Sequence, residues 1–141
     1  MTSWAKFVVI GLLVAGVAIP AARWLSSRRT STPVAAVAPA ELSAAARTGK
    51  TAFDANCAQC HGVNATGTDK GPPFVHPVYN PGHHSDETFF LAPKIGVRSH
   101  HWNFGDMPPQ PQVSPEQLKD IVAYIRAVQE ANGIFYQPHR M

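Results

Sequence analysis

Apolar residues recur at helical spacing in two segments on either side of the middle of the chain. In the first, Ala45, Gly49 and Phe53 lie four residues apart, which places them on one face of a helix over about residues 41–55. In the second, the same period runs through Leu118, Ile121, Tyr124, Ile125 and Val128. We therefore expect an all-α fold in which these two apolar faces wall a shared interior.

Local signals predict where the second of these helices, and one further helix, begin and end. Ser114-Pro115-Glu116-Gln117 is typical of a capping box with proline at the first helical position, and Asn132-Gly133 is typical of a helix end. Ser85-Asp86-Glu87 predicts the start of a short helix. We expect this short helix to break near Pro93 and to end at Gly96.

The two cysteines of the chain lie in one pentapeptide, Cys57-Ala58-Gln59-Cys60-His61. C-x-x-C-H is the spacing of c-type haem attachment. Three residues from thiol to thiol span about one helical turn, which suits the two vinyl groups of a haem, and the next imidazole is then placed beneath the iron. A thioredoxin-like site would need a βαβ setting, and a zinc site would need two more ligands from distant histidines. The motif therefore predicts one covalent haem c, bound by Cys57, Cys60 and His61.

The order of the motifs resembles that of class I monohaem c-type cytochromes, in their small membrane-anchored bacterial form. The resemblance implies that His61 is the proximal iron ligand and Met107 the distal one. It also implies that the carbonyl oxygen of Pro72 accepts a hydrogen bond from the other ring nitrogen of His61. A core methionine is the alternative for Met107, but the other two methionines, Met1 and Met141, are the terminal residues. The resemblance covers about residues 41–133 and rests on Gly49, Phe53, the C-x-x-C-H motif, Gly71-Pro72, Gly105-Asp106-Met107-Pro108 and the helix that holds Tyr124.

An apolar run near the N-terminus predicts a membrane anchor. Residues 7–22 are uncharged and mostly apolar, and they lie between Lys6 and Arg23. Trp4 and Trp24 flank the run at positions that suit membrane interfaces. A cleaved signal peptide is the alternative, although the run ends without a good small-x-small cleavage site.

These features divide the chain into three parts. We expect residues 1–25 to form a transmembrane helix and residues 26–40, rich in serine, proline and alanine, to form an extended tether. Residues 41–141 form the expected cytochrome c domain around the haem.

Charge is distributed unevenly along the chain. Residues 1–39 contain four of the twelve basic residues and none of the nine acidic ones, so they carry +4 and the remainder carries −1. The net charge therefore gives no support for nucleic-acid binding. Arg23, Arg28 and Arg29 follow the apolar run, where the positive-inside rule would favour the cytoplasm. The attachment machinery of the resembled family is periplasmic, so we expect the bacterial inner membrane, with the soluble domain in the periplasm.

Histidine is concentrated in the middle of the chain. His83 and His84 precede the short predicted helix, and His100 and His101 follow it. One interpretation is a surface or an aromatic wall beside the haem, and the other is a second metal site for copper or zinc. Because a ten-residue helix is about 15 Å long, we expect two-histidine sites at its separate ends unless the flanking loops fold back. Replacement of Met107 on the iron by His100 or His101 is a further alternative, and it would lower the reduction potential.

The sequence as a whole predicts an electron carrier with redox proteins as partners and no enzymatic activity. An iron with two axial protein ligands leaves no open position for oxygen or peroxide, and methionine ligation favours a positive potential. One alternative is the cytochrome subunit of a larger oxidoreductase complex. Another is a copper-handling protein in which the haem exchanges an electron with metal bound at the histidine-rich loop.

Overall fold

The computed structural model describes residues 41–138. Its one β-type feature within this range is an isolated antiparallel bridge between Val97 and Met107, so the all-α prediction is confirmed for these residues. None of the helices in this range is long and apolar enough to cross a membrane. The predicted transmembrane helix and tether, residues 1–40, lie outside the described residues. The helical segments in chain order are α2 (Ala44–Asn56), α3 (Ala58–His61), η1 (Val63–Ala65), η2 (Pro77–Tyr79), α4 (Asp86–Ile95) and α5 (Pro115–Ala131).

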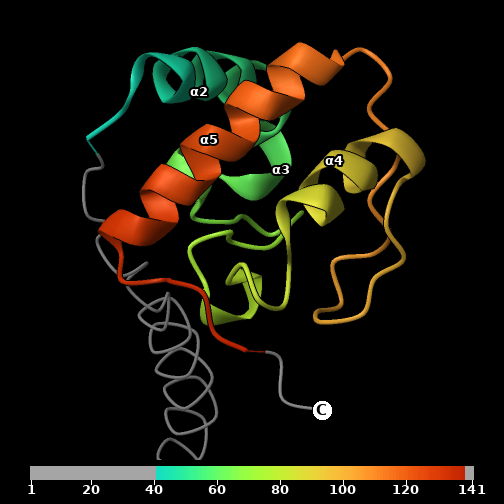
Figure 1. Cartoon of the computed structure of the whole chain (residues 1–141). Coiled ribbons are helices and arrows are strands. Elements are labelled where there is room, and N and C mark those ends of the chain that lie inside the picture. The colour runs from blue at the N-terminus through green and yellow to red at the C-terminus, as the bar shows by residue number, and fades with distance from the viewer. Residues whose placement is uncertain (1–40, 139–141) are drawn as a thin grey trace, which may run out of the picture. The chain divides into compact units, whose positions relative to one another are not determined.

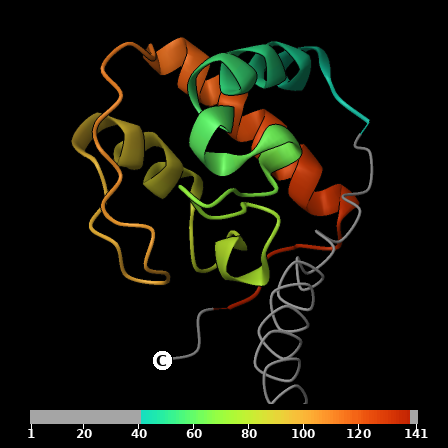
Figure 2. The same ribbon diagram turned by 180° about the vertical axis from the view of Figure 1, so that it is seen from behind.

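Helices α2 and α5 pack directly on each other, and both views show α2 lying across α5 (Figures 1 and 2). Gly49 is buried at this contact, and Phe53 is fully buried beside it. Ala45, which was predicted to share this buried face, is exposed, and Ala46 is buried instead. At about 100° per residue, Ala46 lies closer than Ala45 to the midpoint between Gly49 and Phe53, so the face is rotated slightly from the predicted one.

The predicted ends of α5 are confirmed. The Ser114 hydroxyl accepts a hydrogen bond from the Gln117 backbone N–H, and the Gln117 side chain accepts one from the Ser114 N–H at 3.0 Å. At the other end the helix stops at Ala131, and Gly133 adopts a φ of 75°. The apolar stripe between these ends faces the interior and is buried along its length.

Helix α4 packs against α5 and begins after Ser85, as predicted. The predicted break near Pro93 is wrong, because the helix continues to Ile95 and ends at Gly96. Pro93 lies in the last turn, so its missing N–H removes one hydrogen bond close to the point where the helix ends in any case. Its carbonyl oxygen accepts a hydrogen bond from the Gln110 N–H, which fastens the end of α4 to the following loop.

Candidate functional site

A cavity of about 670 Å³ lies between the helices and the long loops that join them. Side chains from α2, α4, α5 and the loops around Pro72 and Met107 line it, and most of them are aliphatic or aromatic. Its volume falls within the roughly 300–1,000 Å³ that is typical of sites enclosing small molecules and cofactors. We call it the central cavity.

The two thiols of the C-x-x-C-H motif lie one helical turn apart at the start of α3. Cys57 joins α2 to α3, is half-buried and lines the central cavity. Burial, with a smaller contribution from the Cys60 thiol, raises the pKa of Cys57 to about 11. Cys60 is exposed and is not among the residues that line the cavity. The motif therefore presents one sulfur to the interior and one at the protein surface.

His61 is buried and lines the same cavity. Its Nδ1 lies 3.0 Å from the carbonyl oxygen of Pro72, so the contact expected from the family resemblance is present. Because a carbonyl oxygen only accepts, Nδ1 carries the proton and donates it, which leaves the lone pair on Nε2 for a metal ion. Burial lowers the pKa of His61, opposed in part by the Pro72 hydrogen bond, and this favours the neutral ring.

Two neighbours hold the His61 imidazole in place. The Phe74 ring stacks on it with 4.1 Å between centroids and an interplanar angle of 22°. Gly71 allows the Pro72 segment to approach α3, because a Cβ at Gly71 would lie 2.8 Å from the carbonyl oxygen of Cys60. The ring orientation is therefore fixed by a hydrogen bond, a stacked ring and a close backbone approach.

Met107 lines the central cavity from the loop that precedes α5. Its backbone N–H and carbonyl group exchange hydrogen bonds of 2.9 and 3.0 Å with Val97. Gly96, at a φ of 78°, lies against this bridge, since a Cβ there would be 2.7 Å from the Met107 carbonyl oxygen. The backbone thus places the thioether and His61 in the wall of one cavity.

The histidines that flank α4 come together rather than staying at its separate ends. Potential ligand atoms of His83, His84 and His101 all lie within 4.8 Å of one another, and we call these residues the histidine cluster. The expectation of two separate two-histidine sites is therefore wrong, because the loops before and after α4 fold back. His100 is not part of the cluster, and its Nδ1 donates to the Arg98 carbonyl oxygen at 2.8 Å. All three cluster residues also line the central cavity, together with aromatic side chains, as the interpretation of an aromatic wall expected.

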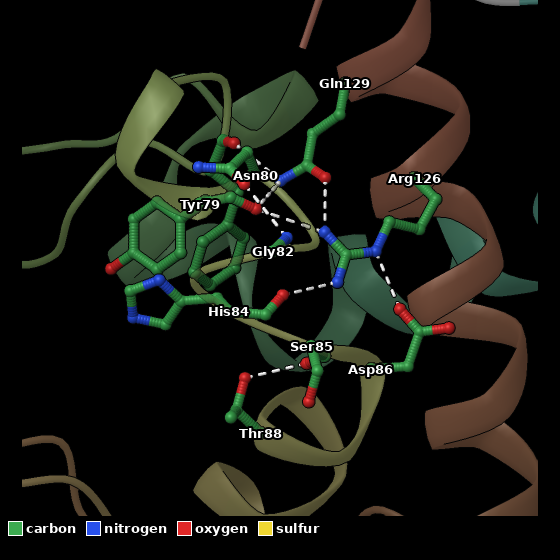
Figure 3. A network of polar contacts seen from close by, with 10 residues as sticks. Tyr79, Asn80, Gly82, His84, Ser85, Asp86, Thr88, Arg126 and Gln129 are labelled. Atoms are coloured by element: carbon green, nitrogen blue, oxygen red, sulfur yellow. Dashed lines mark hydrogen bonds and ion pairs between the residues drawn. The ribbon is translucent and has the colours of Figure 1, made fainter. Parts of the chain in front are cut away.

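Sequence reasoning missed a polar network that holds the histidine-bearing loop against α5 (Figure 3). The Arg126 guanidinium donates to the carbonyl oxygens of Tyr79 and His84 at 3.1 and 2.6 Å and to the Asp86 carboxylate at 2.7 Å. Gln129, 1% exposed, accepts a further hydrogen bond from Arg126 and donates to the Tyr79 carbonyl oxygen at 3.1 Å. The available signal was the position of Gln129, which continues the buried stripe of α5 at helical spacing.

Comparison with known proteins places these features in a family. The model of the family described as cytochrome c matches residues 46–129. The cytochrome bc1 complex cytochrome c subunit of Mycobacterium leprae is 44% identical over 66 residues, which are 46% of this chain and 22% of that protein. The subunit of the same name from Mycobacterium tuberculosis (strain ATCC 25618 / H37Rv) is 43% identical over 60 residues, or 42% of this chain and 21% of that protein. The matched region thus spans about a fifth of the length of these relatives, and no solved structure gives a significant match.

Proposed function

We propose that this protein is a single-haem electron carrier with His61 and Met107 as axial ligands. The chain belongs to the cytochrome c family. The haem of that family is covalently bound, and the thiols of Cys57 and Cys60 fit this attachment. When bound, the haem supplies a one-electron Fe(II)/Fe(III) couple. The residues around the central cavity fit this group. The central cavity is lined mainly by apolar side chains, and the residues in its wall include Cys57, Met107 and His61, whose lowered pKa favours the neutral imidazole.

The observation that carries the proposal is the shared cavity of His61 and Met107. The Pro72 carbonyl oxygen selects the tautomer that leaves Nε2 of His61 available. The Val97 bridge holds Met107 on another segment of the cavity wall. If His61 and Met107 both bound the iron, a bound haem would offer no open site for a substrate, which supports electron transfer without enzymatic activity.

Absorption of the oxidised protein tests this ligand set. The wild type is expected to show the weak far-red band of sulfur bound to ferric haem, and Met107→Ala is expected to lose it while keeping its covalent haem. The control is Val113→Ala, a buried change in the same interhelical loop that alters no sulfur atom. Persistence of the band in Met107→Ala would exclude Met107 as the ligand.

The proposal includes attachment to the bacterial inner membrane, with the haem domain in the periplasm. The apolar run of residues 7–22 and its flanking tryptophans support an anchor. Fractionation of cells expressing the full chain tests this, since an anchored protein stays with the membranes in high salt and alkali and keeps its starting N-terminus. A mature soluble form that begins after residue 22 would show a signal peptide instead.

A second candidate function is that of a subunit in a larger oxidoreductase complex. The names of the mycobacterial relatives favour it, since both proteins are cytochrome c subunits of a bc1 complex. Purification of the full chain in mild detergent separates the two candidates. A complex subunit would elute with other polypeptides in fixed proportion, whereas an independent carrier would elute as a single chain.

A further inference from the structure

The histidine cluster has three nitrogen donors within reach of one metal ion, and none of them belongs to His61, the proposed imidazole ligand of the iron. We propose that His83, His84 and His101 bind one divalent transition-metal ion, with copper(II) bound more tightly than zinc(II). This inference concerns residues that the proposed electron-transfer function does not require. It does not depend on whether Met107 is the iron ligand.

The distance between two of the cluster nitrogens matches that between ligands on one ion. Nε2 of His83 lies 3.4 Å from Nε2 of His101. Two imidazole nitrogens bound tetrahedrally at about 2.0–2.1 Å from an ion are themselves about 3.3–3.4 Å apart. The third ligand atom, from His84, lies within 4.8 Å of the other two, so a small side-chain adjustment completes a three-histidine set.

His84 has the second hydrogen bond that is typical of a metal-ligating histidine. Its Nδ1 donates to the Val78 carbonyl oxygen at 2.8 Å, which fixes the ring and leaves Nε2 as the acceptor. Its own carbonyl oxygen is held by Arg126 at 2.6 Å (Figure 3). The ring and the backbone carbonyl group of His84 are therefore both held in place by the protein before an ion binds.

A tight turn presents His83 and His84 together. The N–H groups of both residues donate to the Asn80 carbonyl oxygen, at 3.0 and 2.9 Å. The Asn80 side chain accepts a further hydrogen bond from the Gly82 N–H. A Cβ at Gly82 would lie 1.8 Å from the Gln137 carbonyl oxygen, so the C-terminal segment packs tightly against this turn.

His101 approaches the turn from a loop that is itself held in place by hydrogen bonds and a ring contact. The Ser99 N–H donates to the Asp106 carboxylate at 2.9 Å, and the Ser99 hydroxyl donates to the Trp102 carbonyl oxygen. The Trp102 ring stacks on Tyr79 with 5.8 Å between centroids and an interplanar angle of 16°. These contacts hold the His101 backbone beside the turn, while its side chain stays exposed to arriving ions.

Three imidazole nitrogens select a particular class of ion. Nitrogen donors suit copper, zinc and nickel, whereas magnesium and calcium require oxygen ligands. The Irving–Williams order places copper(II) above zinc(II) for such a set. Because the cluster lines the central cavity, the competing occupant is a carboxylate group of the haem, which imidazole N–H groups would bind instead.

Titration of copper(II), and separately of zinc(II), into the purified covalent holoprotein tests the proposal. The expected result is one ion per chain in addition to the haem iron, with nitrogen coupling in the electron paramagnetic resonance spectrum of the copper form. His101→Gln and His100→Gln form a matched pair, since both are exposed neighbours on one loop and only His101 belongs to the cluster. We expect His101→Gln to weaken binding about 100-fold or more and His100→Gln to leave it unchanged. His84→Gln, which removes a second cluster ligand, should weaken binding as His101→Gln does.

Three results would overturn the metal site. The first is the absence of a stoichiometric ion in the wild type. The second is equal weakening by His100→Gln and His101→Gln. The third is a change of the haem axial-ligand spectrum in His101→Gln, which would make His101 an iron ligand.

A shift of the haem potential in His84→Gln without metal binding by the wild type would identify the haem carboxylate as the occupant. The stoichiometry and affinity of the added ion do not depend on Met107, so these readouts are separate from the test of the electron carrier.

Discussion

A Cβ atom at Gly49 would lie 1.8 Å from the carbonyl oxygen of Asp120, so α2 and α5 meet backbone to backbone at this point. Gly49→Ala is therefore expected to force the two helices apart and to destabilise the protein by about 3 kcal/mol or more. In an isolated helix, alanine is more favourable than glycine by about 1 kcal/mol, so helix propensity alone would make Gly49→Ala stabilising. A loss of stability therefore reports the clash between the two helices. Thermal unfolding of the holoprotein measures the effect, with Ala45→Gly on the exposed face of α2 as the control. An unchanged or raised Tm for Gly49→Ala would contradict this helix contact.

Arg126 connects α5 to the loop that bears His84. Arg126→Met is expected to cost about 3 kcal/mol, since it leaves backbone carbonyl oxygens without their charged donor. Asp86→Asn should cost less than about 1 kcal/mol, because the Asp86 side chain is 55% exposed. Urea unfolding measures both, and Lys119→Met, an exposed change on the same helix, is the control. Equal losses for Arg126→Met and Asp86→Asn would show that the ion pair, rather than the carbonyl contacts, is the stabilising element.

The hydroxyl of Tyr124 is buried and has no hydrogen-bond partner within residues 41–138. Burial, with a smaller contribution from Asp54, raises the pKa of Tyr124 to about 12. An unfolded tyrosine ionises near pH 10, so the unfolded state binds fewer protons than the folded state above that pH, and stability falls as the pH rises. Tyr124→Phe is expected to keep or raise stability at neutral pH and to flatten the alkaline loss.

Urea unfolding at about pH 7 and about pH 10.5 measures this, bracketing the ordinary tyrosine pKa. Tyr136→Phe is the matched control, since Tyr136 is 68% exposed. Burial also raises the pKa of Tyr79 to about 12, so part of the alkaline loss of stability is expected to remain in Tyr124→Phe. A loss of more than about 1 kcal/mol at neutral pH in Tyr124→Phe would mean that the hydroxyl has a partner.

Each thiol of the attachment motif is expected to form one thioether bond. Cys57→Ala and Cys60→Ala should each retain haem through a single bond at reduced yield, and the double variant should release its haem on extraction with acid and organic solvent. Haem staining after denaturing electrophoresis measures the covalent fraction. Full covalent haem in the double variant would contradict attachment at this motif.

Features set by neighbouring residues could be predicted from the sequence. The capping box of Ser114 and Gln117 and the stop at Gly133 depend on contacts within a few residues, so the local pattern contains them. The contact between His61 and Pro72 spans eleven residues. It was expected from the family resemblance, whereas local residue spacing does not predict a contact at that separation.

Other features depend on contacts between distant segments. The exposure of Ala45 depends on how α5 crosses α2, and the pattern within α2 does not contain that angle. The backbone of His84, which lies near His101, is held by the Arg126 guanidinium, 42 residues later in the chain. Arginine on a helix is usually solvated, so its type gave no indication of this role.

The bridge between Val97 and Met107 closes the loop that carries His101, so we expect Met107 and His101 to belong to one local unfolding unit. The backbone of Met107 moves away from Val97 only when both hydrogen bonds between them break, and the same event releases the loop that carries His101. An ion bound at the proposed cluster site would therefore oppose displacement of the Met107 backbone by mass action on the closed loop, without acting through charge. Hydrogen exchange at the amides of residues 97 and 107 is expected to slow together when the cluster is loaded. If an ion occupies the proposed cluster site, its release is therefore expected to be coupled to the opening of the loop through this single pair of backbone hydrogen bonds.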